Sequence, residues 1–168
     1  MISAIVAVDN NWGIGYKGNL LESIPNDLKH FKEITTNGIV VMGRKTWDSL
    51  PKKPLPNRMN IVITSNPIGK SNGAYFWSLE QAIGFIQLHQ EEREIFIIGG
   101  GQIYEKLFPF CRKVYLTKIL KEYKNVDTYF PQLDNACWLL MEESEIFTHN
   151  NDISYQFLTY RRKFDIFK

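Results

Sequence analysis

Short apolar runs suited to β-strands alternate with helical segments along this chain, and this alternation restricts its possible folds more than any other feature. Because the apolar content of the runs is nearly continuous, we expect both faces of each strand to be buried. Buried strands that alternate with helices are typical of an α/β fold in which the helices cover a central sheet. The predicted strands are Ile2 to Val8, Gly38 to Met42, Met59 to Ile63, Glu94 to Ile98 and Val114 to Ile119.

The C-terminal part has a different pattern. Two runs, from Leu139 to Glu145 and from Ser154 to Arg162, are predicted to form an antiparallel strand pair joined through the polar segment 148–152. The predicted fold is therefore a mixed, mainly parallel sheet with flanking helices and an antiparallel C-terminal strand pair. No repeat, low-complexity tract or linker divides the 168 residues, so we expect a single domain over residues 1–168.

Helices are expected to begin near four positions: Pro25, Lys45, Ser78 and Gly101. Ser78 and Gln81 have the spacing of a capping box, in which each side chain binds the backbone of the other residue. Apolar residues then recur at helical spacing after Ser78. This third helix is therefore interpreted as structural.

Composition excludes several functional classes. A net charge of +2, with 44% hydrophobic and 23% charged residues, implies no general affinity for nucleic acid or membranes. Two isolated cysteines are too few for a disulfide framework or a metal site, and they favour a reducing cytoplasm. The first residues lack the pattern of a signal peptide, and no apolar run is long enough to span a bilayer. We expect a cytoplasmic monomer without a metal ion.

A carboxylate lies within the first turn of the first predicted helix. Pro25 suits that turn, and Asp27 is one turn before Phe31, so a charge and an aromatic ring share one helix face. This combination is expected where a small, flat, partly cationic ligand is bound. From this segment alone, the alternative that Asp27 only complements the helix dipole stays open.

Polar or glycine residues follow three of the predicted strands. Glycines at the end of a strand allow backbone N–H groups to approach a phosphate, although they could also serve only for tight contact between a helix and the sheet. Ligands of open α/β sheets lie across the carboxyl ends of the strands, so the three segments could line one crevice. They are Gly99-Gly100-Gly101-Gln102, Arg44-Lys45-Thr46 and Thr64-Ser65. Their charges and hydroxyls suit a phosphate monoester such as the 2′-phosphate of NADP, whereas each could separately be a solvated surface group.

Seven motifs occur in an order typical of one family. They are Ala4 to Asp9, Gly13 to Gly15, Pro25 to Leu28, Val41 to Trp47, Leu55 to Asn60, Ile98 to Tyr104 and Asp127 to Pro131. Together they closely resemble dihydrofolate reductase of the chromosomal bacterial type. The resemblance extends from Met1 to about Arg162.

The resemblance implies an NADPH-dependent oxidoreductase of one-carbon metabolism. Such an enzyme transfers hydride from nicotinamide C4 to C6 of 7,8-dihydrofolate while N5 gains a proton, which gives 5,6,7,8-tetrahydrofolate. Antifolate inhibitors would occupy the same site. No nucleic acid, membrane or metal is implied.

The family's functional residues can be assigned to matching positions here. Asp27 resembles the carboxylate that pairs with pteridine N3 and the 2-amino group, and Thr117 would orient it. The catalytic candidates are Asp27, Thr117, Leu20 and Glu22. The substrate-binding candidates are Ile5, Val6, Asp27, Leu28, Phe31, Leu50, Leu55, Arg58, Ile98 and Thr117. The cofactor-binding candidates are Ala7, Ile14, Gly43, Arg44, Lys45, Thr46, Thr64, Ser65, Gly99, Gly100, Gly101, Gln102, Ile103 and Tyr104.

Three further expectations follow once the family's pattern is accepted. Burial should raise the pKa of Asp27, whereas a hydrogen bond from Thr117 and a cationic ligand should oppose that rise. The family also has a cis peptide bond between paired glycines, for which Gly99 and Gly100 are the candidates. Arg58 would hold the α-carboxylate of the substrate's glutamate tail through two hydrogen bonds.

Glu22 departs from the family, which normally has Trp at this position, preceded by Pro. An ionised carboxylate cannot replace the indole N–H that helps to hold a water near the pteridine carbonyl oxygen. We expect Glu22 to point into solvent, because burying a charge without a partner is costly. The alternative is that Glu22 enters the site as a second carboxylate with a raised pKa. As a hypothesis, this departure alters loop mobility and antifolate affinity.

Two other functions are compatible with parts of the pattern. A riboflavin-pathway pyrimidine reductase would use the same cofactor, but it would not need Asp27, Phe31 and Arg58 arranged for a pteridine glutamate. A nucleotide-binding module without catalysis would retain only the cofactor side.

Overall fold

The computed structural model describes residues 1–164, and residues 165–168 of the expected domain lie outside the described part. The strands are β1 (Ile2–Val8), β2 (Gly13–Tyr16), β3 (Asn19–Leu20), β4 (Ile39–Gly43), β5 (Met59–Ile63), β6 (Gly69–Ser71), β7 (Ala74–Trp77), β8 (Ile95–Gly99), β9 (Lys113–Ile119), β10 (Thr128–Tyr129), β11 (Trp138–Glu143), β12 (Phe147–His149) and β13 (Ile153–Arg162). The helices are α1 (Pro25–Thr35), α2 (Arg44–Ser49), α3 (Leu79–His89) and α4 (Gly101–Leu107), and a 3₁₀ turn spans Phe108–Phe110.

One large sheet forms the centre of the molecule, with the strand order β11-β13-β9-β1-β8-β4-β5-β7-β6 and with β12 paired to β13. The strands from β9 to β7 along this path pair in parallel, whereas β13 is antiparallel to β9 and to β11. A separate small sheet has the order β10-β2-β3. The mixed, mainly parallel α/β fold predicted from the sequence is therefore confirmed.

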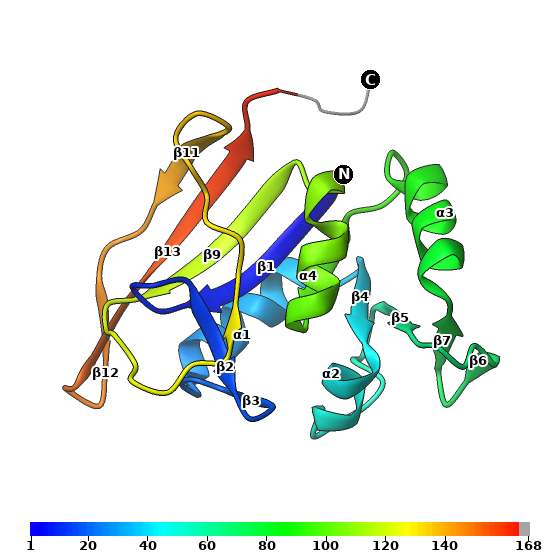
Figure 1. Cartoon of the computed structure of the whole chain (residues 1–168), viewed down its shortest axis with the longest axis horizontal. Coiled ribbons are helices and arrows are strands. Elements are labelled where there is room, and N and C mark those ends of the chain that lie inside the picture. The colour runs from blue at the N-terminus through cyan, green and yellow to red at the C-terminus, as the bar shows by residue number, and fades with distance from the viewer. Residues whose placement is uncertain (165–168) are drawn as a thin grey trace.

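Helices cover both faces of the large sheet. Figure 1 shows α4 in front of the strands and α1 behind them. The α4 face packs β1 residues Val6 and Val8 against Ile86 of α3 and Leu107 of α4. The opposite face, called the α1 face below, packs Ile5 of β1 with side chains from α1 and α2. Because side chains alternate along a strand, neighbouring residues of β1 serve opposite faces.

The structure confirms the main predicted elements and adds several short ones. The capping box at the start of α3 is present, since Ser78 accepts from the Gln81 N–H at 3.1 Å and Gln81 accepts from the Ser78 N–H at 2.9 Å. The predicted connecting segment 148–152 is partly wrong, because β12 extends to His149 and the turn spans residues 150–152, in which Asn150 and Asn151 have positive φ. The short strands β2, β3, β6, β7 and β10 were not predicted, because two to four residues carry too little periodicity.

The helices of residues 1–164 lack the combination of length and apolar character that crossing a bilayer requires.

Candidate functional site

A carboxylate and a hydroxyl meet on the α1 face of the sheet. Asp27 lies in the first turn of α1, where Pro25 occupies the first helical position, and the helix begins after the buried Ile24. Thr117 lies in β9 and is 3% exposed. Its hydroxyl donates a hydrogen bond of 2.6 Å to Asp27 Oδ1. The hydroxyl thus fixes one carboxylate oxygen and leaves the other as an acceptor for a ligand.

The surroundings change the ionisation of this carboxyl group. Burial raises the pKa of Asp27, and the hydrogen bond from Thr117 and the nearby His30 oppose that rise. His30 stands one turn further along α1, where its ring stacks on Phe157 with 3.8 Å between centroids. Burial lowers the pKa of His30. The predicted opposition between burial and the Thr117 hydrogen bond is confirmed, and His30 adds a contribution that was not predicted.

Apolar side chains surround the α1 face near this carboxylate. Ile5 of β1 belongs to a buried cluster with Val40, Met42 and Trp47. Four partly buried residues named as substrate-binding candidates pack against the same cluster: Phe31, Leu50, Leu55 and Ile98. Leu28, which follows Asp27, is 53% exposed. The arrangement joins one carboxylate to an apolar wall, which can bind a flat heterocycle with a few polar groups at one edge.

A buried asparagine shapes the loop that carries Leu55 and Arg58. Asn60 is 1% exposed, accepts from the Leu55 N–H at 2.9 Å and donates to the carbonyl oxygens of Leu55 and Arg58 at 3.0 Å. Arg58 donates from Nη1 to Thr35 Oγ1 at 3.0 Å, and its guanidinium carbon is 5.9 Å from the centroid of the Phe31 ring. A cation is therefore held at the edge of the apolar wall.

Three parallel strands end side by side at a second edge of this face. β8, β4 and β5 are neighbours in the sheet, and Met42 of β4 is in register with Gly99 of β8, while Gly43 pairs with Ile63 of β5. The three segments predicted to line one crevice therefore follow adjacent strand ends. Arg44 and Lys45 are exposed there, and Arg44 Nε is 3.1 Å from Asp48 Oδ1.

Glycines allow the segments at this edge to pack closely. A Cβ atom on Gly43 would lie 3.0 Å from Ile103 Cγ1, and one on Gly101 would lie 2.4 Å from Thr128 Cγ2. The peptide bond between Gly99 and Gly100 is cis, as the family's pattern implied. Gly43 and Gly101 therefore serve tight contacts within the protein. A Cβ atom on Gly100 would meet Thr46 Oγ1 at 3.6 Å, so the backbone there leaves room for the approach of a phosphate.

Comparison with known proteins agrees with this geometry. A sequence model of the family described as dihydrofolate reductase matches residues 1–162. The chain belongs to the dihydrofolate reductase family. It is 40% identical over 164 residues to the dihydrofolate reductase of Bacillus subtilis, a match that covers 97% of this chain and 95% of that protein. It is 44% identical over 131 residues to a dihydrofolate reductase of Buchnera aphidicola, with coverage of 78% and 79%.

A solved member of the dihydrofolate reductase family has the same fold. The structure of dihydrofolate reductase from Enterococcus faecalis, complexed with NADP(H) and RAB-propyl, superposes with a TM-score of 0.82. The sequence identity is 33%, and the match covers 97% of this chain and 96% of that one. The α/β architecture is therefore that of a dihydrofolate reductase over nearly the whole chain.

Three of the residues assigned from the dihydrofolate reductase pattern have side chains that are buried in the protein. Val6 and Ile14 pack in the buried cluster of the α4 face, because Val6 alternates with Ile5 along β1. Tyr104 is also buried there, and its hydroxyl donates to the Ile5 carbonyl oxygen at 2.7 Å. Burial and the nearby Asp27 carboxylate raise the pKa of Tyr104. The Tyr104 hydroxyl thus serves an internal hydrogen bond that links α4 to β1.

Glu22, where dihydrofolate reductases normally have Trp, has a partner that the sequence did not predict. The side chain is half-buried, and Oε1 accepts a hydrogen bond of 3.0 Å from the Tyr123 hydroxyl. The expectation that Glu22 points freely into solvent is therefore wrong. The physical reason is that the hydrogen bond from the Tyr123 hydroxyl compensates for the water that the half-buried Glu22 carboxylate loses.

Three residues near the candidate site were not identified from the sequence as parts of it. Asn60 was recognised only as part of a motif, although a polar residue inside the apolar run 59–63 could have marked it as a structural hydrogen-bonding group. His30 received no role from the sequence, because a single histidine on a helix is no signal by itself. Tyr123 has no local signal, since its partners Glu22 and Asp9 are more than 100 residues away.

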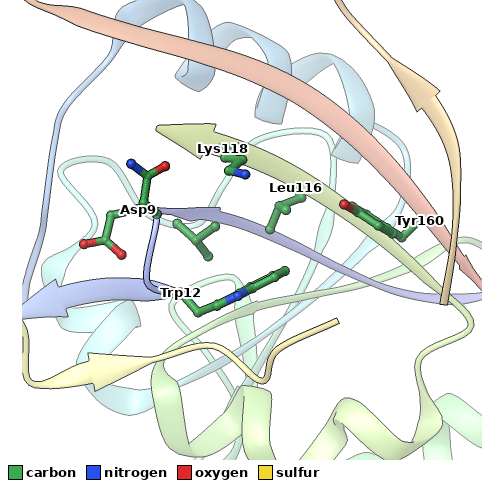
Figure 2. A pocket seen from close by; sticks show the side chains of 7 residues that line it. Asp9, Trp12, Leu116, Lys118 and Tyr160 are labelled. Carbon is green, nitrogen blue, oxygen red and sulfur yellow. The ribbon is translucent and has the colours of Figure 1, made fainter. Parts of the chain in front are cut away.

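A small cavity lies on the other face of the sheet. It has a volume of about 50 Å³ and is lined by Val8, Asp9, Asn10, Trp12, Leu116, Lys118 and Tyr160. Figure 2 shows Trp12, Leu116 and Tyr160 around it, beside the end of β1. Leu116 and Lys118 alternate with Thr117 along β9, so this cavity faces away from Asp27. It is also far smaller than the pockets of about 300 Å³ or more that bind cofactors.

Proposed function

We propose that this protein is an NADPH-dependent dihydrofolate reductase that converts 7,8-dihydrofolate to 5,6,7,8-tetrahydrofolate for one-carbon metabolism. The single observation that carries the proposal is the Asp27 carboxylate, oriented by Thr117 at 2.6 Å beside the apolar wall of the α1 face. Membership of the dihydrofolate reductase family over residues 1–162 supports it.

Asp27 would bind the pteridine at N3 and the 2-amino group, while Thr117 keeps the carboxylate in that orientation. This end of the heterocycle is remote from N5, so Asp27 assists the protonation of N5 indirectly and a water molecule delivers the proton. The carboxylate contributes through its charge, which stabilises a protonated heterocycle in a pocket of low polarity.

The apolar residues and Arg58 would hold the rest of the substrate. Ile5, Phe31 and the neighbouring side chains of the apolar wall exclude water from the heterocycle and from the benzoyl group. Arg58, at the edge of that wall, would bind the α-carboxylate of the glutamate tail. Leu28 and Leu20 are 53% and 70% exposed and are available to be covered by ligand.

NADPH, when bound, supplies the hydride. The residues present fit this cofactor, because glycine-rich backbone and exposed cations follow three adjacent parallel strands. Gly100, Gly101, Gln102 and Ile103 would hold the pyrophosphate, and Arg44, Lys45, Thr64 and Ser65 would bind the adenosine phosphate. Ala7 would border the nicotinamide from the α1 face, where it packs beside Ile24.

Further parts of the proposal concern the whole chain. We propose a cytoplasmic monomer that acts as one domain, without nucleic acid, membrane or a metal ion, and that binds antifolate inhibitors at the substrate site. The net charge of +2 and the continuous main sheet support this view. Cys111 is buried and both cysteines are free thiols, which supports a reducing compartment.

The decisive experiment follows the decay of NADPH absorbance with dihydrofolate. Oxidation that depends on dihydrofolate supports the proposal. Activity only with a ribosylamino-pyrimidine would indicate the pyrimidine reductase instead, and NADPH binding without turnover would indicate a non-catalytic module.

A variant at Asp27 tests the assigned role. Asp27→Asn removes the charge, so turnover at neutral pH should fall by about 10²-fold or more, and by less at acidic pH, where the substrate is already partly protonated. Steady-state rates measured from acidic to neutral pH check this. An equal loss at every pH would argue against the electrostatic role.

A further inference from the structure

Tyr123 forms hydrogen bonds through both its backbone and its side chain, and no role assigned above involves it. Its backbone N–H donates to Asp9 Oδ2 at 3.2 Å, and its hydroxyl donates to Glu22 Oε1 at 3.0 Å. Its ring is partly buried against a cluster that contains Ile24 and, at its margin, Ala7. Tyr123 therefore joins the 120–123 segment to the chain just before α1.

Asp9 makes the backbone end of this connection rigid. It is 2% exposed, lies directly after β1 (Figure 2), and accepts backbone hydrogen bonds from Gly13 at 2.8 Å and from Asn11 at 2.9 Å. The Asn10 N–H also donates to the Lys121 carbonyl oxygen at 3.0 Å. Since a buried carboxylate with several donors is costly to disturb, the Tyr123 backbone has a fixed position.

The hydroxyl end reaches the segment that starts the substrate-binding helix. Glu22 is two residues before Ile24, and the Ile24 carbonyl oxygen accepts from the N–H groups of Asp27 at 3.0 Å and Leu28 at 3.1 Å. Ile24 is 3% exposed, so the segment between Glu22 and α1 is short and anchored. A hydrogen bond at Glu22 thus restrains the first turn of α1, which carries Asp27.

The Tyr123 hydroxyl is a dependable donor. Burial raises the pKa of Tyr123, and the Glu22 and Asp9 carboxylates raise it further, so the hydroxyl stays protonated at neutral pH. Different groups act on Asp27: burial raises its pKa, and the hydrogen bond from Thr117 and the nearby His30 oppose that rise. Glu22 is hydrogen-bonded to the Tyr123 hydroxyl.

We propose that Tyr123 is a positioning residue of the reduction, which acts through its hydrogen bond to Glu22 to fix the first turn of α1 against the bound pteridine. This inference rests on the proposed function. According to this inference, Tyr123 and Glu22 together restrain the segment before α1, in which this chain lacks the family's usual Pro and Trp.

The test compares steady-state kinetics of the full chain and its variants with dihydrofolate and NADPH. Tyr123→Phe removes only the hydroxyl, so the KM for dihydrofolate should rise about 3- to 10-fold while the KM for NADPH stays unchanged. Tyr129→Phe is the matched control, because Tyr129 is 55% exposed on β10, and its kinetics should equal those of the starting protein.

A double-mutant cycle separates positioning from a general loss of stability. Glu22→Ala should raise the KM for dihydrofolate as much as Tyr123→Phe does, and the double variant should be no worse than either single one. Glu22→Gln keeps an acceptor oxygen and should lose less than Glu22→Ala. Thermal unfolding of each variant ensures that rates are compared on folded protein.

Two results would overturn the inference. One is an unchanged KM for dihydrofolate in Tyr123→Phe, or in Glu22→Ala if the tyrosine variant does not fold. The other is a double variant in which the effects of Tyr123→Phe and Glu22→Ala on the KM for dihydrofolate add up. If the starting protein itself does not oxidise NADPH with dihydrofolate, the proposed function fails instead, and this outcome is recognised before any variant is compared.

Discussion

At the scale of single residues, Asp27 combines a functional charge with an unfavourable environment. Burial raises its pKa above the ordinary value of 3.8, and one hydrogen bond from Thr117 only partly opposes this. A carboxyl group whose pKa is raised by folding stabilises the folded state below pH 3.8, and this contribution is lost as the pH rises through the raised pKa. At neutral pH the ionised Asp27 therefore destabilises the ligand-free protein.

Replacing this charge should make the ligand-free protein more stable. Asp27→Asn keeps an acceptor oxygen for Thr117, so its melting temperature should exceed that of the starting protein at pH 7 to 8. The difference should shrink as the pH falls towards 4, because Asp27 becomes protonated. Thermal unfolding across this range checks the prediction, and a difference that is independent of pH would contradict it.

Local sequence signals explain why some site residues could be predicted and others could not. Asp27 follows Pro25 at a spacing that places it in the first turn of a helix, so its location was predictable. Thr117 was assigned only through the family's pattern. Tyr123 could not be found in this way, because its contacts with Asp9 and Glu22 depend on how two distant loops fold together.

At the scale of elements, the start of α4 requires glycine at position 101. A Cβ atom at Gly101 would lie 2.4 Å from Thr128 Cγ2, and Thr128 cannot easily rotate away, because its hydroxyl donates to Asp127 Oδ1 at 2.8 Å. Gly101→Ala should therefore cost about 1–3 kcal/mol of unfolding free energy and weaken NADPH binding. Urea unfolding and fluorescence titration with NADPH measure the two effects.

Gly84 provides the matched control for this substitution. It lies inside α3, is exposed, and has open space where a Cβ atom would stand. Gly84→Ala should increase stability by about 0.5–1 kcal/mol through the helix propensity of alanine, without a change in NADPH binding. Equal effects of the two substitutions would show that the contact with Thr128 does not matter.

The elements themselves were predictable to different degrees. β1 and β5 match their predicted limits, because each is a nearly continuous apolar run buried in the sheet, interrupted by one polar residue. β2 and β10 were not predicted, since their pairing joins Gly15 to Thr128 across the chain. Such pairing is determined by the meeting of two loops rather than by a periodic pattern within either segment.

At the scale of the whole molecule, Arg162 connects the end of the main sheet to the region after α4. Its Nε donates to the Cys111 carbonyl oxygen at 2.8 Å and its Nη2 to the Phe108 carbonyl oxygen at 2.9 Å. The guanidinium carbon is also 4.3 Å from the centroid of the Trp138 ring. A planar cation with several donors is suited to this position.

Replacing Arg162 should therefore weaken the whole fold. Arg162→Lys retains the charge, but a lysine cannot form both hydrogen bonds and at the same time stack on the Trp138 ring. The unfolding free energy should therefore fall by about 1–3 kcal/mol. Arg161→Lys is the control at an exposed neighbour and should change it by less than about 0.5 kcal/mol. Similar urea midpoints for the two variants would refute this role of Arg162.

The arrangement of the whole chain gives Asp27 its proposed task, because α1 places this carboxylate on the face of the sheet where three parallel strand ends and the apolar wall meet. The most direct test is a crystal structure with folate and NADP bound together. We predict Asp27 oxygens at about 2.6–3.2 Å from pteridine N3 and the 2-amino group, with the nicotinamide beside the same heterocycle. A heterocycle bound away from Asp27 would contradict the account.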